Sequence, residues 1–357
     1  MKAFIPCLIY AFFFLSCKTN INTKEAKSIN SVEIKTLLAD TLLNIRALEV
    51  TKQAVYAATS KGEFYKLNLT DTVFNKVSFL HKKANIDTIG NNNFRALAVV
   101  NASNNKIKQD IFAITIASPA KLYKNGELVY QENNEKAFYD ALAFWNNQEG
   151  IAIGDPTDAC MSIIITRNGG ETWEKINCSL LPEKEEGEAA FAASDTNIAI
   201  KGDKTWVATG GKSSRILFSP DKGKTWEVYN TPIVQGLETT GMYSLAFYDA
   251  KNGFAIGGDY TKPEANTANK IRTKDGGKTW QLVVNTQNPG YRSCVQYVPN
   301  SNAKKLVAIG FKGIDYSADA GNTWKHLSDS SFYTIRFVND SIAYAAGNGR
   351  ISKLTFR

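Results

Sequence analysis

The chain has 357 residues, of which 43% are hydrophobic and 21% are charged, as in an ordinary folded protein. Its net charge is +8, but Lys and Arg are scattered among Asp and Glu without a basic block, so nucleic acid is not an expected partner. The two His lack partners at metal-ligand spacing, and no Gly-rich dinucleotide fingerprint opens a helix. We therefore expect neither a metal nor an organic cofactor. A Ser-His-Asp triad is also not expected, because the chain has only two His residues.

Residues 1–17 have the layout of a secretory signal. Met1 and Lys2 precede an apolar run, 3–15, that is short for a membrane span. The following Phe14-Leu15-Ser16-Cys17 resembles a bacterial lipobox, in which Cys17 becomes the lipidated first residue of the mature chain. A plain signal peptide cut nearby is the alternative, and both interpretations predict export.

Residues 18–30 are polar and rich in Lys and Asn, as expected of a flexible tether. No later segment reaches 18 consecutive apolar residues, so a lipid anchor would be the chain's only attachment to the membrane. The expected location is the cell envelope, on the periplasmic side or the cell surface, and a monomer is expected.

A short strand pattern recurs from residue 45 to the end of the chain. Most copies continue into a turn, a strand of small residues, a third strand and a hairpin. The copies begin 49, 45, 48, 56, 48 and 42 residues apart, which gives seven units of four strands. They open with Ile45-Arg46, Phe94-Arg95, Tyr139-Asp140, Gly187-Glu188, Tyr243-Ser244, Tyr291-Arg292 and Tyr333-Thr334.

Four of these units contain the motif Ser/Thr-x-Asp/Asn-x-Gly-x-Thr-Trp. The Asp or Asn can accept hydrogen bonds from N–H groups of its own turn, and the Gly supplies a positive φ. The Trp can pack between units. The Asp/Asn positions lie 53, 54 and 44 residues apart, and the copies begin at Thr166, Ser219, Thr273 and Ser317.

These motifs resemble Asp-box (BNR) repeats, found in sialidase-like propellers and in photosystem II stability/assembly-factor-like propellers of bacteria. In such propellers the Asp-boxes lie on turns away from the central pocket, which implies a structural role here. Seven four-stranded units predict an all-β fold, a seven-bladed β-propeller over residues 31–357. The last unit lacks an outer strand, and Val32–Leu38 is expected to supply it, so that the N- and C-terminal strands close the ring.

The three cysteines that follow the predicted signal and tether are a pair and a single residue. Cys160 and Cys178 bracket the first Asp-box hairpin symmetrically, so they are expected to lie opposite each other and form a disulfide in an oxidising compartment. Cys294 lies in an apolar strand and is expected to be a buried thiol.

One mouth of the central channel is expected to collect charged residues, because the inner strands of a propeller all begin there. The residues in second position of the seven inner strands are Arg46, Arg95, Asp140, Glu188, Ser244, Arg292 and Thr334. The same mouth should receive Arg215, Asp155 and Asp259 from the links between second and third strands, together with Tyr291 and Tyr333.

This set predicts an acidic glycan as ligand. Arginines hold a carboxylate bidentately, and Asp140 with Glu188 could serve as acid and base of a glycosyl hydrolase of sialidase-like type. Sialidase-like propellers have a similar layout, with an arginine cluster, an acid and a Tyr–Glu pair. No Tyr–Glu pair aligns with this sequence, and the arginines fall on units one, two and six.

Two alternatives stay open. The charged ring could pair within itself and fill the channel, or the protein could be a non-enzymatic scaffold or assembly factor that holds an envelope protein, as the assembly-factor resemblance implies. A deep pocket with Asp140 and Glu188 roughly 5–10 Å apart would favour the enzyme. A filled, salt-bridged channel would favour the scaffold.

Overall fold

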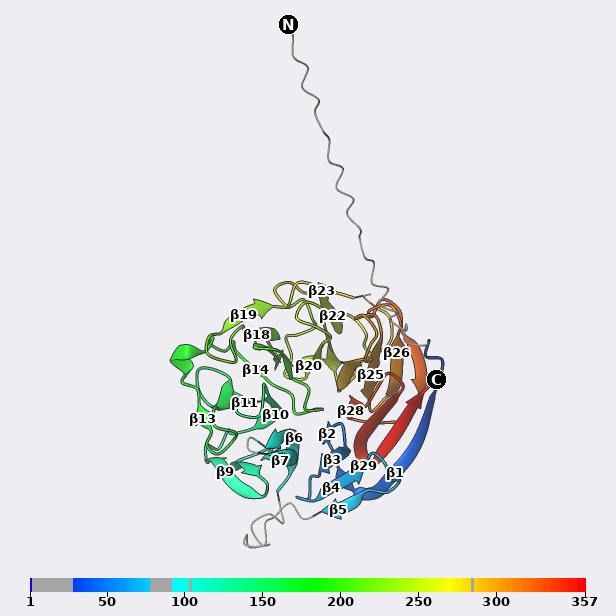
Figure 1. Cartoon of the computed structure of the whole chain (residues 1–357). Coiled ribbons are helices and arrows are strands. Elements are labelled where there is room, and N and C mark those ends of the chain that lie inside the picture. The colour runs from blue at the N-terminus through cyan, green and yellow to red at the C-terminus, as the bar shows by residue number, and fades with distance from the viewer. Residues whose placement is uncertain (2–27, 78–91, 103–104, 284–285) are drawn as a thin grey trace.

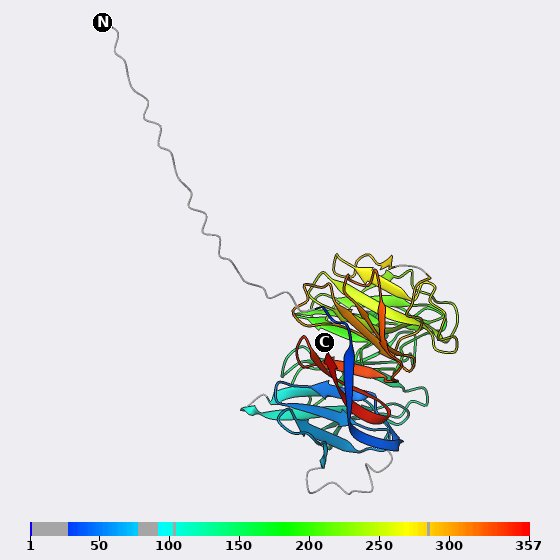
Figure 2. The same cartoon turned by 90° about the vertical axis from the view of Figure 1, so that its right-hand side faces the viewer.

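The computed structural model describes Met1 and residues 28–77, 92–102, 105–283 and 286–357. Its strands form seven sheets arranged around a central axis, seen along the axis in Figure 1 and from the side in Figure 2. The predicted all-β, seven-bladed propeller is confirmed. Cys17 and most of the predicted signal and tether lie outside the described residues. Within the described part, no helix is long and apolar enough to cross a membrane.

The first six blades are antiparallel sheets whose first strands surround the axis. Blades 1 to 3 consist of β2 (Ala47–Val50), β3 (Ala54–Ala58), β4 (Phe64–Asn68) and β5 (Asn75–Val77); β6 (Phe94–Ala102), β7 (Asn105–Thr115), β8 (Ala120–Lys124) and β9 (Glu127–Glu132); and β10 (Tyr139–Phe144), β11 (Gly150–Gly154), β12 (Ser162–Thr166) and β13 (Glu174–Lys175). Blades 4 to 6 consist of β15 (Ile198–Lys201), β16 (Lys204–Ala208), β18 (Arg215–Ser219) and β19 (Glu227–Asn230); β20 (Thr240–Phe247), β21 (Gly253–Asp259), β22 (Lys270–Thr273) and β23 (Gln281–Leu282); and β24 (Cys294–Tyr297), β25 (Leu306–Gly310), β26 (Gly313–Ser317) and β27 (Lys325–Ser328).

Blade 7 closes the ring with both ends of the chain. It contains β28 (Thr334–Phe337), β29 (Ile342–Phe356) and β1 (Val32–Asn44). Strand β29 folds back on itself, since the Phe356 amide donates to the Ser341 carbonyl at 2.8 Å, and its two halves pair with β28 and with β1. In Figure 1 the blue β1 lies beside the red β29. The predicted closure is confirmed, with an N-terminal strand longer than expected.

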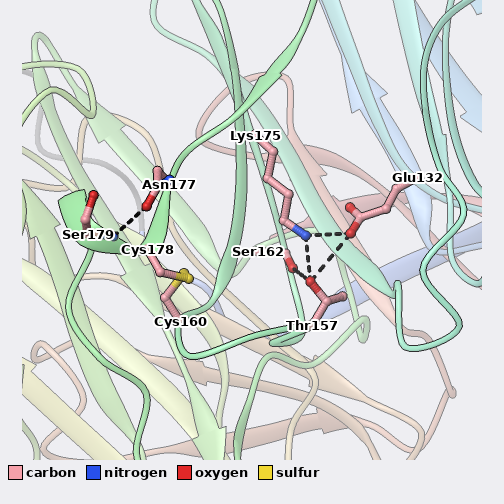
Figure 3. Close-up of a disulfide and its surroundings, with 8 residues drawn as sticks. All are labelled: Glu132, Thr157, Cys160, Ser162, Lys175, Asn177, Cys178 and Ser179. Atoms are coloured by element: carbon pink, nitrogen blue, oxygen red, sulfur yellow. Dashed lines mark hydrogen bonds and ion pairs between the residues drawn. A yellow bond between two sulfur atoms is a disulfide. The ribbon is translucent and has the colours of Figure 1, made fainter.

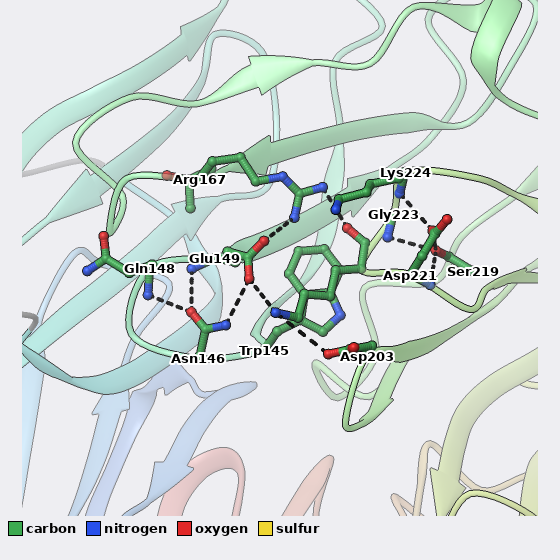
Figure 4. A network of polar contacts seen from close by, with 12 residues as sticks. Trp145, Asn146, Gln148, Glu149, Arg167, Asp203, Ser219, Asp221, Gly223 and Lys224 are labelled. Carbon is green, nitrogen blue, oxygen red and sulfur yellow. Dashed lines mark hydrogen bonds and ion pairs between the residues drawn. The ribbon is translucent and has the colours of Figure 1, made fainter.

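Each of the four motif turns packs against the preceding blade. In the second copy the Ser219 hydroxyl accepts from the Gly223 amide at 2.7 Å (Figure 4). Asp221 Oδ1 accepts from the Thr225 amide at 2.8 Å. All four motif glycines have φ between 78° and 88°. A Cβ on any of them would collide with a side chain of the preceding blade, namely Phe112, Ile165, Trp206 or Phe254. Glycine is therefore required twice, by the positive φ and by the close approach.

A polar network on the same face fastens blade 3 to blade 4 (Figure 4). Arg167 forms an ion pair with Glu149 at 2.9 Å and donates to the Lys222 carbonyl at 2.6 Å. Its guanidinium also lies over the Trp145 ring, 5.3 Å from the centroid. These contacts thus connect blades 3 and 4 on the face that carries the motif turns.

The predicted disulfide between Cys160 and Cys178 is present, with the two Cα atoms 5.4 Å apart (Figure 3). It joins the link before β12 to a short 3-10 helix, η2 (Cys178–Leu180), whose start is capped by Asn177 through the Ser179 amide. Cys294 is a buried free thiol, as predicted.

The structure corrects the predicted inner strand of the fourth unit. Glu188 does not begin that strand; it lies in β14 (Glu188–Ala189), which pairs with β17 (Gly210–Gly211) beside blade 5. The inner strand is β15, which begins at Ile198. Residues 190–197, here called the channel segment, lie between the two strands.

Candidate functional site

The channel segment fills the central channel. Its residues Ser194, Asp195, Thr196 and Asn197 are all buried, with at most 8% of any residue exposed. It leads into the inner strand of blade 4, and it forms hydrogen bonds at or just before the inner strand of each of the other six blades. The partners, from blades 1, 2, 3, 5, 6 and 7, are Arg46, Leu97, Leu142, Leu245, Ser293 and Thr334.

Asp195 is the central residue of this segment. Its two carboxylate oxygens accept from the backbone amides of Leu97, at 2.9 Å, and Leu142, at 3.0 Å. Burial raises the pKa of Asp195 to about 8, although Arg336 and the two amide bonds oppose the rise. The carboxylate therefore bridges blades 2 and 3 through donors that burial would otherwise leave without partners.

The predicted charged mouth, where the inner strands begin, is here called the arginine-side mouth. Arg46 donates to the Ala193 carbonyl at 2.7 Å, and its guanidinium lies 3.8 Å from the centroid of the Tyr333 ring. Arg95 donates to the Ala192 carbonyl at 3.3 Å. Burial and then the neighbouring Arg46 lower the pKa of Arg95 to about 10. Two predicted ligand-binding arginines thus bind the protein's own backbone.

The third arginine of the predicted ring is engaged elsewhere. Arg292 forms a buried ion pair with Asp315, with Nε 2.6 Å from Oδ2, and donates to the Tyr291 carbonyl. Tyr291 itself packs in an aromatic cluster, 4.8 Å from Tyr243 and 5.3 Å from Phe311 between ring centroids. The guanidinium of Arg292 is therefore held by an acid of its own blade.

Asp140 lies fully buried at the arginine-side mouth. It has no exposed surface, and neither carboxylate oxygen has a hydrogen-bond partner among the described residues. Burial raises its pKa well above the usual value, Asp155 adds to the rise, and Arg95 opposes it. Burial also raises the pKa of Asp155 to about 6, although this carboxylate accepts from the Ala190 amide at 2.8 Å.

The other predicted residues lie apart from this cluster. Glu188 is bound by Arg215 through two contacts, of 2.5 and 3.1 Å, and it accepts from Thr209. Asp259 accepts from the backbone and hydroxyl of Thr261. The structure thus gathers Arg46, Arg95, Asp140, Asp155 and Tyr333, and does not place Glu188 among the groups that contact Asp140.

A cavity of about 540 Å³ opens at the opposite mouth, where the inner strands end. We call it the funnel. Most of the wall residues are of apolar type, although polar atoms contribute more than half of the exposed surface. Four of the wall positions are the alanines 98, 143, 199 and 246, which leave the channel wide at this end. Asp195, Glu49 and Arg336 lie at the narrow end, where the channel segment forms the floor.

Arg336 is central to the floor of the funnel. It donates to the carbonyls of Ser194, at 3.3 Å, and Asp195, at 3.0 Å. Its Nε lies 3.6 Å from Glu49 Oε2, and Nη2 lies 4.0 Å from Asp195 Oδ2. Burial raises the pKa of Glu49 and Arg336 opposes the rise, while one third of the Glu49 side chain stays exposed. Two carboxylates therefore share one guanidinium.

Lys201 lies at the rim of the funnel, at the end of β15. Burial lowers its pKa, and Asp249 opposes that shift. None of the funnel residues was predicted from the sequence. A usable signal was present, because Glu49 and Arg336 follow the predicted ring by two or three positions along their strands. No three His, Cys, Asp or Glu side chains gather as a metal site among the residues that the structure describes.

No family model matches this chain, and no curated protein sequence matches it. Several solved structures are similar. "YCF48 bound to D1 peptide" is 13% identical with TM-score 0.61 and covers 93% of this chain and 98% of its own. YCF48 from Cyanidioschyzon merolae is 12% identical with TM-score 0.60 and covers 92% and 99%. A streptogramin B lyase is 13% identical with TM-score 0.65 and covers 92% and 98%. At such identities the likeness shows the propeller fold alone.

Proposed function

We propose that this protein is a non-enzymatic propeller scaffold that binds a partner protein in the cell envelope. The filled channel is the observation that carries this proposal. Because Arg46 and Arg95 donate to the channel segment, the arginine-side mouth is engaged in binding the protein's own chain. The funnel is left as a concave surface with both apolar and polar parts, which suits a polypeptide ligand.

Glycan hydrolysis at the arginine-side mouth has less support. The predicted acid Asp140 has no exposed surface, and the predicted base Glu188 is held in a buried ion pair with Arg215. A substrate would reach them only after these contacts had broken. Binding of a peptide by a propeller has a precedent in YCF48 bound to D1 peptide, a protein of the same fold.

Export and lipid anchoring remain part of the proposal, supported by the residue pattern up to Cys17. Cys17→Ala should abolish lipidation and move the protein from the membrane fraction to the soluble fraction. Metabolic labelling with an alkyne fatty acid, followed by fractionation, measures both effects. A variant that stays with the membranes as the parent does would exclude this mode of anchoring.

Photo-crosslinking in cells tests the scaffold function. A benzoyl-phenylalanine at Tyr248 or Tyr297, in the funnel wall, should give a covalent adduct with one protein of defined mass. The matched control is the same substitution at the exposed Tyr260, beside Tyr291 on the arginine side, which should give none. Release of sugar from acidic oligosaccharides by the purified chain, without any funnel adduct, would refute the scaffold function.

A further inference from the structure

The funnel combines apolar walls with an acidic floor. Its walls include Val99, Ile198 and Ile200, all half-buried, so apolar surface faces the cavity. The floor presents Glu49 and Asp195 around Arg336. A ligand that fits both regions needs an apolar stem and a polar end group.

The charge of the floor defines that end group. Arg336 directs its hydrogen bonds to neutral acceptors, which are the carbonyls of Ser194, Asp195 and Ile335 and the Thr334 hydroxyl. Its single positive charge is opposed by the carboxyl groups of Glu49 and Asp195. The floor therefore holds two carboxyl groups against one guanidinium. At neutral pH Asp195, with a pKa of about 8, keeps its proton and Glu49 balances Arg336. Ionisation of Asp195, which an incoming cation favours, gives the floor a net charge of about −1 in a recessed position, where charge interactions are strong.

Lys201 does not neutralise this floor. It ends β15 and pairs with Lys204 across the turn, so it lies at the rim, and the charge that acts on it is that of Asp249. Glu49 is the floor carboxyl that an incoming group can reach, because 33% of its side chain is exposed against 1% for Asp195.

We propose that the funnel binds one Lys or Arg side chain of a partner polypeptide, with the methylene stem against the apolar walls and the cationic head on Glu49. This inference rests on the proposed scaffold function and identifies the partner surface as a basic residue in an apolar segment. Long basic side chains bury their stems along apolar surface while the charge meets a carboxylate. About 540 Å³ is ample for one such side chain and its neighbours.

Fluorescence polarisation with the purified full-length chain tests the proposal. The probes are labelled, acetylated and amidated heptapeptides with one central Arg or Lys flanked by Val and Leu, and matched peptides with citrulline or norleucine. The basic peptides should bind about tenfold or more tightly than their neutral matches, as for a hydrogen bond to a charged group. Equal affinity for basic and neutral peptides, or no binding of either, overturns the proposal.

Two variants locate the effect. Glu49→Gln should remove the preference for basic peptides, and Ala246→Leu should weaken all the peptides by filling the funnel. The exposed residues 238 and 159 provide matched controls, Glu238→Gln and Ala159→Leu, which should change neither. An unchanged preference in Glu49→Gln would overturn the proposal. If funnel adducts still form in cells, the scaffold function survives that result; if they are missing, both proposals fail.

Discussion

The two mouths of the channel are built from the same inner strands, yet they differ in what is left for a ligand. On the arginine side, Arg46 and Arg95 meet carbonyl oxygens of the channel segment. In the funnel, small alanines leave volume, and Glu49 and Asp195 share Arg336. A ring of charged residues therefore indicates a binding site only where their side chains are not already hydrogen-bonded to the protein itself.

The ion pair between Arg215 and Glu188 offers the largest expected effect. Glu188 is fully buried in its side chain and Arg215 is 9% exposed, so Arg215→Ala leaves an uncompensated buried carboxylate. We expect a loss of about 3–5 kcal/mol in the free energy of unfolding, measured by urea denaturation. Lys212→Ala, which removes an exposed pair with Glu186, should cost under about 1 kcal/mol. A similarly small loss in Arg215→Ala would mean that Glu188 is free for chemistry.

Removing the disulfide is expected to have the next largest effect on stability, and the effect should centre on the region around η2. Replacing Cys160 and Cys178 by Ala should cost roughly 3 kcal/mol, since the bridge closes a loop with a sequence separation of 18 residues. Hydrogen exchange should rise around η2 and stay unchanged in the funnel walls. Mass spectrometry without reduction checks the link itself, and two free thiols in protein from an oxidising compartment would contradict it.

Substitution of Arg46 tests whether the arginine-side mouth has a structural role or binds a ligand. Arg46→Ala leaves the Ala193 carbonyl without this donor, so we expect a loss of about 1–3 kcal/mol in thermal or urea unfolding. Arg46→Lys should recover only part of it, because an ammonium cannot reproduce the planar guanidinium over Tyr333. Peptide affinity at the funnel should not change. Loss of binding to acidic oligosaccharides with unchanged stability would instead restore the glycan hypothesis.

Asp140 gives an effect on stability that depends on pH. The raised pKa means that the folded protein holds a proton on Asp140 above pH 4, where an unfolded Asp has lost it. Its contribution therefore lowers stability as pH rises from about 4 toward the folded pKa. Asp140→Asn removes this contribution, so the melting temperature of the variant relative to the parent should rise between pH 5 and pH 8. A difference that stays constant, or falls, would contradict the burial of this carboxyl.

The fold could be predicted because its signals are local and repeated. Positive-φ glycines, turn acids and returning Trp residues recur in four copies, and the disulfide follows from the symmetry of Cys160 and Cys178 about a turn. Closure by the two termini followed from the missing outer strand of the last unit. Apart from the closure, each of these inferences needed only residues close together in the chain.

The site could not be predicted in the same way. The longest step between inner strands, 56 residues, contains the channel segment, but Gly187-Glu188 imitates the start of a strand. Nothing local in residues 190–197 indicates that their partners lie on six other blades. The funnel depends on alanines that carry no chemical signature, and on Asp195, whose partners Leu97 and Leu142 are backbone amides far along the chain.

The closing of the ring by β1 and β29 has a consequence for the order of folding. The ion pair of Glu33 with Arg357 joins residues 324 apart in the chain, so the ring closes only when two distant segments of the chain meet. Until then β1 and β29 present unpaired strand edges, and the apolar side chains of blades 1 and 6 that pack against blade 7 stay uncovered. Such distant pairing implies slow folding. Removing the final strand segment would therefore trap an open, association-prone ring, even though every site residue is still present.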